Sequence, residues 1–544
     1  MMTSDFTQKT KDLIDNLKGT CASYGLGNDG NESKIITQVF LYKFMNDKFG
    51  YDLKSIDKTF TGKESWEKIV SDMPEATFNR ITLKLNPSTA KLKREHLLSY
   101  LYNKQNTKNF SKLFDTTLID ISQSNASIFS VSTASNAKIV LFDELSQFVS
   151  DPSQRDDFCR AIINQLVNFS FEEIFTQKFD FFATVIEYLN KDYNKDGGGK
   201  YAEYYTPHAV SKIMSKILVT GPRSNVTVYD PSAGSGTLLM NVAHEIGEKN
   251  CSIFSQDISQ KSTGMLRLNL ILNNLVHSIP NVIQGNTLKE PAHREGKGLK
   301  KFDFIVSNPP FKLDFSDFRE DLDTPGNAER FFAGIPAIPK KDKDKMAIYL
   351  LFIQHIIFSL SADGNAAIVV PTGFLSGKDT ITKAIRKYLV EEKLFVGAIS
   401  MPSNIFANTG TQVSVLFLNK VKQKKAAFLI DASNMGTTIK EGKNQKTLLS
   451  EDDENKIIDS FKSRNVEEDF SVDVSFDEIS QSGYSFNPGQ YFKVIFNIQK
   501  ITQEEFHENT SDLLDSISDN LQKIGKDHLE LTKKLRELKV NNRA

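Results

Sequence analysis

The sequence predicts an α/β fold flanked by a helical N-terminal segment and a long C-terminal helix. From about residue 225 onward, short β-branched and aromatic runs alternate with helical patterns, which is typical of strands covered by helices. Before that point, apolar residues recur three and four apart, as in helices that bury one face. Near the C-terminus the same spacing continues as a heptad repeat.

The composition is that of an ordinary globular protein. The chain has 544 residues, of which 39% are hydrophobic and 25% charged, with a mean hydropathy of -0.34. This length allows two to four domains of roughly 100–200 residues each. No run is apolar and long enough to span a bilayer, and the N-terminus lacks a signal-peptide core. No membrane association is therefore expected.

The charge balance gives no sign of strong nucleic-acid binding by the chain alone. The formal net charge is -1, so any basic groove is local or is supplied partly by a partner. The three cysteines, Cys21, Cys159 and Cys251, form no CxxC pair. Neither a disulfide framework nor a zinc site is predicted, and we expect no metal and a reducing cytoplasm.

Four segments are predicted along the chain. Residues 1–165 form a helical N-terminal domain, 166–430 the strand–helix domain that carries the motifs, 431–500 a charged peripheral segment, and 501–544 the C-terminal helix. In the first segment Leu13 and Leu17 share a helical face, and Ile36 and Phe40 repeat that spacing. No pattern there points to chemistry.

A helix start follows the run Glu203-Tyr204-Tyr205. Thr206 is the predicted N-cap and Pro207 the first helical residue, with Val210, Ile213 and Ile217 forming the buried stripe. A capped helix start presents free backbone N–H groups that suit a carboxylate. Helix capping alone is the simpler interpretation.

The first predicted strand of the central domain ends in a glycine-rich loop. Val226–Tyr229 is the strand, Asp230-Pro231-Ser232-Ala233-Gly234-Ser235-Gly236 the loop, and Thr237–Ala243 the helix that follows. Gly234 and Gly236 allow a tight turn and the close approach of a ligand. No lysine follows Gly236, so a nucleoside without phosphates fits better than a phosphate-clamping loop.

Two polar residues follow the next two predicted strands. Asp257 comes after 252–255, about twenty residues beyond the glycines, where related sheets place a carboxylate on ribose hydroxyls. Asn286 lies on the loop that ends the strand beginning at Val282. Loop, helix and acid together indicate a nucleoside cofactor site.

The tetrapeptide Asn308-Pro309-Pro310-Phe311 ends the predicted strand Phe302–Val306. The prolines stop the strand, because they cannot donate ladder hydrogen bonds. An amide, a rigid turn and an exposed aromatic ring then lie at the carboxyl edge of the sheet, where ligands bind. They suit a planar group with an exocyclic amine, such as a nucleobase. A plain strand followed by a turn is the alternative.

Three further strands complete a predicted set of about seven: 364–370, 394–400 and 413–419, the first preceded by a helix at 346–360. The tail carries a heptad seam of apolar residues with one histidine, sustained for about four heptads: Leu514, Ile517, Leu521, Ile524, His528, Leu531, Leu535 and Leu538. A seam without a partner in the sequence favours contact with another chain over packing on this one.

With these motifs in order, the chain resembles the modification (methylation) subunits of type I restriction-modification systems. Those proteins are S-adenosylmethionine-dependent adenine-N6 DNA methyltransferases. The stretches Tyr204–Pro207, Asp230–Gly236 and Asn308–Phe311 carry the resemblance, which covers nearly the whole chain. It implies a Rossmann-like S-adenosylmethionine-dependent methyltransferase sheet.

The resemblance also implies roles for the motifs. Asn308, Pro309, Pro310 and Phe311 would hold the target adenine. S-adenosylmethionine would be bound by Glu203, Tyr204, Tyr205, Thr206, Pro207, Asp230, Gly234, Ser235, Gly236, Thr237, Asp257 and Asn286. Two positions depart from the family. Asn286 stands where an acid often holds the cofactor's adenine amine, and Ala202 replaces a common glycine. An asparagine carbonyl still accepts that hydrogen bond.

The implied partners are double-stranded DNA and a specificity subunit that reads its sequence, in an assembly of two modification subunits with one specificity subunit. A separate restriction subunit joins the full complex. A protein or RNA methyltransferase with the same Asn-Pro-Pro-Phe site is one alternative, and a non-catalytic scaffold is the other. Because the resemblance assigns sequence recognition to the specificity subunit, the DNA recognition sequence cannot be read from this chain.

Overall fold

A computed structural model describes residues 2–27, 30–175, 206–406, 412–421, 426–441, 444–492 and 503–541. The chain divides into two compact units, Met1–Phe492 and Lys493–Ala544. Glu203, Tyr204 and Tyr205 lie outside the described residues.

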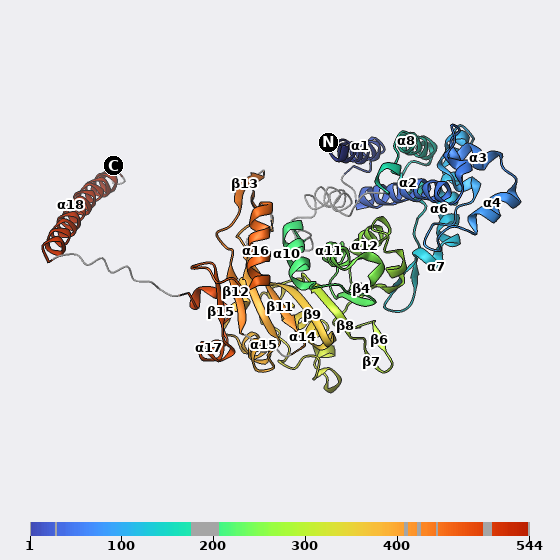
Figure 1. Cartoon of the computed structure of the whole chain (residues 1–544). Coiled ribbons are helices and arrows are strands. Elements are labelled where there is room, and N and C mark those ends of the chain that lie inside the picture. Colours follow the sequence, from blue (N-terminus) through green and yellow to red (C-terminus); the bar gives the residue numbers. More distant parts are fainter. Residues whose placement is uncertain are drawn as a thin grey trace. The chain divides into compact units, whose positions relative to one another are not determined.

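The first unit is built around one large sheet (Figure 1). Within the described residues this sheet has eleven strands in the order β15-β12-β10-β11-β9-β8-β3-β4-β5-β1-β2. In chain order the strands are β1 (Val131–Thr133), β2 (Lys138–Ile139), β3 (Val226–Asp230), β4 (Cys251–Asp257), β5 (Val282–Gln284), β8 (Phe302–Ser307), β9 (Leu360–Pro371), β10 (Phe395–Ser400), β11 (Val413–Asn419), β12 (Ala427–Asp431) and β15 (Ser471–Val474).

Eight of these strands run in the same direction. The pairs β1–β5, β5–β4, β4–β3, β3–β8, β8–β9 and β10–β12 are parallel. Strand β11 is antiparallel to both β9 and β10, so β10 and β12 regain the common direction. The carboxyl ends of the eight strands therefore share one edge of the sheet, which is where ligands bind in open α/β folds.

Helices cover both faces of the sheet, and alternate residues of one strand show it. On β9, Ala367 and Val369 belong to the core on the side of α10 (His208–Leu218), α11 (Thr237–Ile246), α12 (Gln260–Leu272) and α16 (Glu451–Ser463). Ile368 and Val370 belong to the opposite core, with α14 (Tyr349–Ser359), α15 (Thr380–Glu391) and α17 (Phe476–Gln481). This two-sided burial explains why the central strands are continuously apolar. The predicted α/β fold is confirmed.

The helical N-terminal region is also confirmed. It contains α1 (Met2–Ser23), α2 (Gly30–Ile56), α3 (Trp66–Asp72), α4 (Glu75–Thr82), α5 (Leu98–Lys104), α6 (Phe110–Ser124), α7 (Ala126–Phe129) and α8 (Arg155–Val167). The sequence did not reveal that the same region adds β1 and β2 to the sheet, with Ser132 opposite Ile283 of β5. The helical region and the sheet therefore share one continuous core.

One buried arginine fastens this connection. Arg267 of α12 is 8% exposed. Its guanidinium donates to the carbonyl oxygens of Ile139 (3.2 Å), Val140 (2.9 Å) and Leu141 (3.4 Å). Burial lowers its pKa to about 10. The arginine thus ties α12 to the carbonyls at the end of the β1–β2 hairpin.

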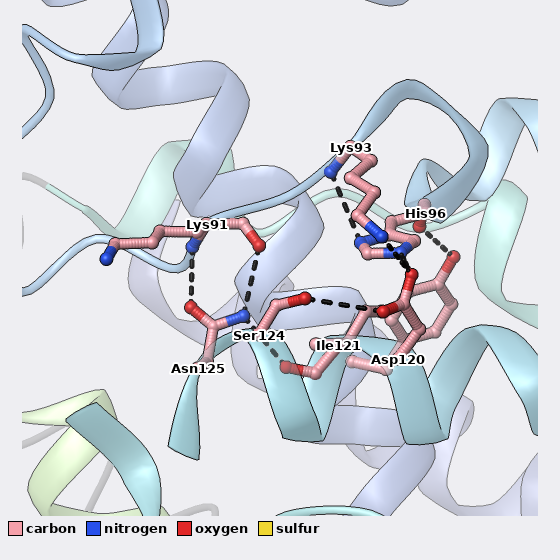
Figure 2. Close-up of polar contacts among 8 residues, drawn as sticks. Lys91, Lys93, His96, Asp120, Ile121, Ser124 and Asn125 are labelled. Carbon is pink, nitrogen blue, oxygen red and sulfur yellow. Dashed lines mark hydrogen bonds and ion pairs between the residues drawn. The ribbon is translucent and has the colours of Figure 1, made fainter. Parts of the chain in front are cut away.

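Figure 2 shows a polar cluster that fixes the segment before α5 against α6. The backbone N–H of Lys93 donates to His96 Nδ1 (3.2 Å), and His96 Nε2 lies 2.8 Å from Asp120 Oδ2. Burial lowers the pKa of His96, so the ring is neutral and its Nε2–H donates to Asp120. Asn125 adds a second attachment, accepting from the N–H of Lys91 (2.7 Å) and donating to its carbonyl (3.0 Å).

The first unit also contains two small hairpins and a short helix. They are β6 (Arg294–Glu295) with β7 (Gly298–Leu299), β13 (Thr437–Glu441) with β14 (Asn444–Leu448), and α13 (Arg319–Leu322). The residues after β12 also carry α16, β15 and α17, and Ile457, Phe461 and Val474 of these elements are buried in the two cores.

The second unit contains α18 (Gln503–Asn541), and the predicted C-terminal helix is therefore present. Among its described side chains, the heptad residues are 48% to 63% exposed: Leu514, Ile517, Leu521, Ile524 and Leu531. His528 is exposed as well, while the side chains of Leu535 and Leu538 lie outside the described residues. No helix in the described ranges is both long and apolar enough to cross a membrane.

Candidate active site

The predicted site residues that follow neighbouring strands meet at the carboxyl edge of the sheet. Asp230 ends β3 opposite Ser255 of β4, and Asp257 ends β4 opposite Gln284 of β5. Asn286 lies two residues beyond the end of β5. On the other side of β3, β8 delivers Asn308 to the same edge. Residues far apart in sequence are thus brought together by parallel pairing.

The glycine loop after β3 is held from inside by hydrogen bonds. Asp230 Oδ1 accepts from the backbone N–H of Ser232 (2.9 Å), and the Ser232 and Ser307 hydroxyls share a hydrogen bond of 2.7 Å. Gly234 and Gly236 have φ values of 53° and 82°, in the left-handed region. A Cβ on Gly236 would lie 2.2 Å from Leu266 Cδ1. The backbone conformation therefore favours glycine at both positions. The Ser232–Ser307 hydrogen bond places the loop beside the end of β8, which leads into the tetrapeptide.

Two carboxyl groups stand at the base of this loop. Burial raises the pKa of Asp230 to about 7, and the nearby charge of Asp257 adds to the rise. Burial also raises the pKa of Asp257, although its carboxylate accepts backbone N–H bonds from Ser259 and Gly234, both at 2.8 Å. In this conformation Asp230 supports the loop from within. Asp257, which is only half-buried, ties the loop to the start of α12.

The Asn286 side chain caps the turn that follows it. Its Oδ1 accepts from the backbone N–H of Leu288 (3.0 Å) and of Lys289 (3.2 Å). A carbonyl oxygen has two lone pairs, so both are used locally. The oxygen that the sequence interpretation offered to the cofactor is therefore engaged within the turn.

The tetrapeptide combines a buried amide with a supported aromatic ring. Asn308 is 7% exposed, and its Nδ2 has no hydrogen-bond partner among the described residues. An unpaired buried amide is rare in folded proteins and often marks a functional position. Phe311 was expected to be exposed but is half-buried, because Tyr349 of α14 packs edge-on against it with ring centroids 6.3 Å apart.

The predicted helix start at Thr206 needs a correction. Helix α10 begins at His208, and Pro207 is the N-cap, with φ -54° and ψ 142°. The Pro207 carbonyl accepts from the N–H of Ser211 (3.0 Å), as an N-cap carbonyl does. Thr206 precedes the cap and is buried. The extended ψ of Pro207 keeps this residue outside the helix and places the helix start one residue later than predicted.

Several contributors to this edge were missed by sequence reasoning. Ser307 joins β8 to the glycine loop, Tyr349 supports Phe311, and the Thr287 hydroxyl donates to the carbonyl of Pro231 (2.6 Å). None belongs to a recognisable motif. Their positions at or shortly after the end of a buried strand, or at a helix start, were the available signals. In the described part of the chain, no group of three or more His, Cys, Asp or Glu side chains is arranged to hold a metal ion.

The chain matches known proteins over most of its length. The N-6 DNA Methylase family matches residues 177–499. The methylase subunit of the type I restriction enzyme MpnII from Mycoplasma pneumoniae is 28% identical over 381 residues, which are 68% of this chain and 67% of that relative. The corresponding MjaIX subunit from Methanocaldococcus jannaschii is 25% identical over 394 residues, 68% of this chain and 66% of that one.

A solved structure has the same fold. The methyltransferase subunit of a type I restriction-modification system from Streptococcus thermophilus superimposes with a TM-score of 0.72, covering 91% of this chain and 100% of that one at 23% identity. The predicted resemblance is therefore confirmed, since the family match alone spans more than half of the chain. The chain belongs to the N-6 DNA methylase family.

Proposed function

We propose that this chain is the modification subunit of a type I restriction-modification system. It transfers a methyl group from S-adenosylmethionine to N6 of adenine in double-stranded DNA. The observation that carries the proposal is the position of Asn308. Its buried, unpaired amide lies at the carboxyl edge, one residue after the serine that is hydrogen-bonded to the glycine loop. A methyl-donor site and an amine-holding site then share one edge.

The residues of the loop region fit a nucleoside cofactor. The loop offers positive-φ glycines and no lysine or arginine, and the carboxyl groups of Asp230 and Asp257 lie at its base. This suits ribose and an amino-acid chain better than phosphates. When bound, the cofactor supplies a methyl group activated by a sulfonium. The residues proposed to hold it are Glu203, Tyr204, Tyr205, Thr206, Pro207, Asp230, Gly234, Ser235, Gly236, Thr237, Asp257 and Asn286.

The tetrapeptide is proposed to hold an adenine that has left the duplex, since its N6 is otherwise paired and out of reach. The Asn308 side-chain oxygen and a carbonyl of the Pro309-Pro310 turn accept the two amine hydrogens. This draws the nitrogen lone pair out of conjugation with the ring and directs it at the methyl group. Phe311 stacks on the base, worth about 1–3 kcal/mol in comparable contacts. Positioning and electrostatics then supply the rate enhancement.

The partner assignments follow from the same proposal. The exposed apolar seam of α18 is suited to helix packing with another chain, here a specificity subunit shared by two modification subunits. A separate restriction subunit completes the system, and the complex acts in the cytoplasm, where its DNA lies. The segment limits 1–165, 166–430, 431–500 and 501–544 belong to this proposal.

Co-expression with the cognate specificity subunit tests the proposal. DNA from those cells is digested to nucleosides, and N6-methyladenine, N4-methylcytosine and 5-methylcytosine are quantified by mass spectrometry. We expect N6-methyladenine at one short sequence motif, and none in cells that carry Asn308→Ala. Methylation of protein or RNA with no change in DNA would contradict the proposal.

A further inference from the structure

A buried arginine outside every predicted motif braces the two loops of the proposed cofactor site. Arg330 is 3% exposed and forms no ion pair with a carboxylate in the described ranges. Its Nη1 donates to the carbonyl of Leu288 (2.7 Å), its Nη2 to the carbonyl of Thr287 (2.9 Å), and its Nε to His355 Nδ1 (3.0 Å). Each of the three guanidinium nitrogens therefore donates a hydrogen bond.

The 286–289 turn is held on both sides by these contacts. Its N–H groups at Leu288 and Lys289 point to Asn286 Oδ1. The carbonyls of Thr287 and Leu288 point the other way, to Arg330. A turn fixed through both its donors and its acceptors has little freedom to rearrange, so the direction in which Asn286 presents its amide is set largely by Arg330.

The same brace reaches the glycine loop. The Thr287 hydroxyl donates to the carbonyl of Pro231 at 2.6 Å, and Pro231 directly follows Asp230. A continuous path of hydrogen bonds thus runs from Arg330 through the 286–289 turn to the loop after β3. A displacement of Arg330 would therefore change the positions of both loops.

The far end of the brace is anchored in α14. His355 is 2% exposed. Burial and the charge of Arg330 lower its pKa well below the usual range, so the ring is neutral and Nδ1 is free to accept. Its Nε2 faces the Tyr229 hydroxyl at 3.3 Å. The neighbouring Gln354 accepts from the N–H of Ala333 (2.8 Å) and donates to the carbonyl of Gly334 (3.0 Å), which holds the chain next to Arg330.

We infer that Arg330, seated on His355, is a positioning residue for the cofactor: it holds the 286–289 turn and the glycine loop in the conformation that binds S-adenosylmethionine. This inference rests on the proposed function. A buried cation without a carboxylate is expensive to keep, and here its charge is offset by two loop carbonyls whose position it defines. Lysine cannot replace it, because an ammonium does not reach two carbonyls and a ring nitrogen in one plane.

The chain offers a matched control. Arg386 of α15 is also buried, at 2% exposure, and donates to three carbonyls, those of Tyr484 (2.6 Å), Phe374 (2.5 Å) and Gly377 (2.7 Å). It bonds to neither of the two loops. Arg386→Lys therefore removes the same kind of hydrogen bonds from an equally buried arginine. It shows how the loss of a buried guanidinium affects cofactor binding when neither loop is involved.

The experiment measures binding of S-adenosylhomocysteine by calorimetry to the full chain in complex with its specificity subunit, for wild type, Arg330→Lys and Arg386→Lys. When a loop occupies the binding-competent conformation for only a fraction of the time, the apparent affinity is multiplied by that fraction. We expect about a tenfold or greater loss for Arg330→Lys and less than about a threefold loss for Arg386→Lys. The milder Thr287→Val, which removes only the hydroxyl, should fall between them.

Hydrogen exchange of the Leu288 and Lys289 amides gives a second readout that does not depend on activity. Arg330→Lys should lose protection at both amides in the ligand-free protein and regain it with S-adenosylhomocysteine, whereas Arg386→Lys keeps it throughout. Equal affinity losses in the two lysine variants, or unchanged protection in Arg330→Lys, would overturn the inference while wild-type binding still stands. A wild-type complex that binds no S-adenosylhomocysteine would instead overturn the proposed function.

Discussion

Replacing Asp230 by asparagine should stabilise the protein at neutral and alkaline pH. The side chain is 1% exposed, and burial raises its pKa to about 7 from a usual value of 3.8. A carboxyl with a raised pKa binds its proton more tightly in the folded protein than in the unfolded chain. The stability that the protonated carboxyl contributes to the fold is therefore fully present below about pH 4, and it is lost as the pH rises through about 7.

The shift sets the size of the effect. Each pKa unit corresponds to 1.36 kcal/mol, so the ionised Asp230 costs at most about 4 kcal/mol above pH 8. Asparagine removes the charge and keeps an oxygen that accepts from the Ser232 N–H, now as a weaker neutral bond. A net gain of about 1–3 kcal/mol remains, which corresponds to a few degrees in Tm for a large unit.

The assay is thermal unfolding of wild type and Asp230→Asn, without cofactor, from pH 4.5 to 8.5 at constant ionic strength. The difference in Tm should be positive at pH 8 and shrink toward zero at pH 5. Asp151→Asn is the matched control, because Asp151 makes the same bonds to Ser153 N (2.9 Å) and Oγ (2.8 Å) but is exposed. These bonds lower its pKa, so its replacement should not stabilise the protein at pH 8.

A Tm difference that does not change with pH would refute the reasoning. So would a lower Tm for Asp230→Asn at pH 8, because either result means that the carboxylate is not penalised by burial. The glycine loop would then be held by the charge of Asp230 rather than by its shape and hydrogen bonds.

Three further substitutions test other parts of the account. Gly236→Ala should lower Tm and weaken S-adenosylhomocysteine binding, because φ is 82° and the new Cβ would lie 2.2 Å from Leu266 Cδ1. An unchanged Tm and an unchanged affinity in calorimetry would exclude this clash. Phe311→Ala should reduce methyl transfer at least about tenfold with cofactor affinity unchanged, since the stacking on the base is lost. Parallel losses of both would point to a general defect. Arg267→Met should destabilise the protein by about 1–3 kcal/mol in denaturant titration, because the carbonyls of Ile139, Val140 and Leu141 lose a charged donor. An unchanged midpoint would contradict the role given to this arginine.

Much of the central sheet was predictable because its strands are buried on both faces. Continuous apolar runs such as Ile305–Val306, punctuated by glycine and proline, gave β3 to β5, β8, β10 and β11 close to their observed limits. Strand β9 was also predicted, but it begins at Leu360, before the predicted start at residue 364. Strands β1, β2 and β15 were missed, since they have two to four residues and partly exposed side chains. Strand β1 pairs with residues about 150 positions away, and no local pattern reports such a pairing.

The site was predictable where function depends on backbone shape, and less so where it depends on tertiary contacts. Gly234 and Gly236 occupy left-handed conformations that require glycine, so their presence is informative by itself. The burial of Phe311 depends on Tyr349, and the conformation after Asn286 depends on Arg330. A charged residue such as Arg330 is normally exposed, which is why its place beneath the site emerged only from the fold.

Methyl transfer by Asn308→Ala, measured in a single turnover alongside binding of S-adenosylhomocysteine, tests the central claim most directly. The matched control is Asn327→Ala, because the Asn327 amide donates to the carbonyl of Leu322 (3.2 Å) outside the site residues. Removing one preorganised polar group from a reacting centre typically costs about 100-fold or more in rate. We predict a loss of that size for Asn308→Ala with cofactor affinity within about threefold of wild type, and a normal rate for the control. Methylation of adenine by Asn308→Ala at the wild-type rate would contradict the account.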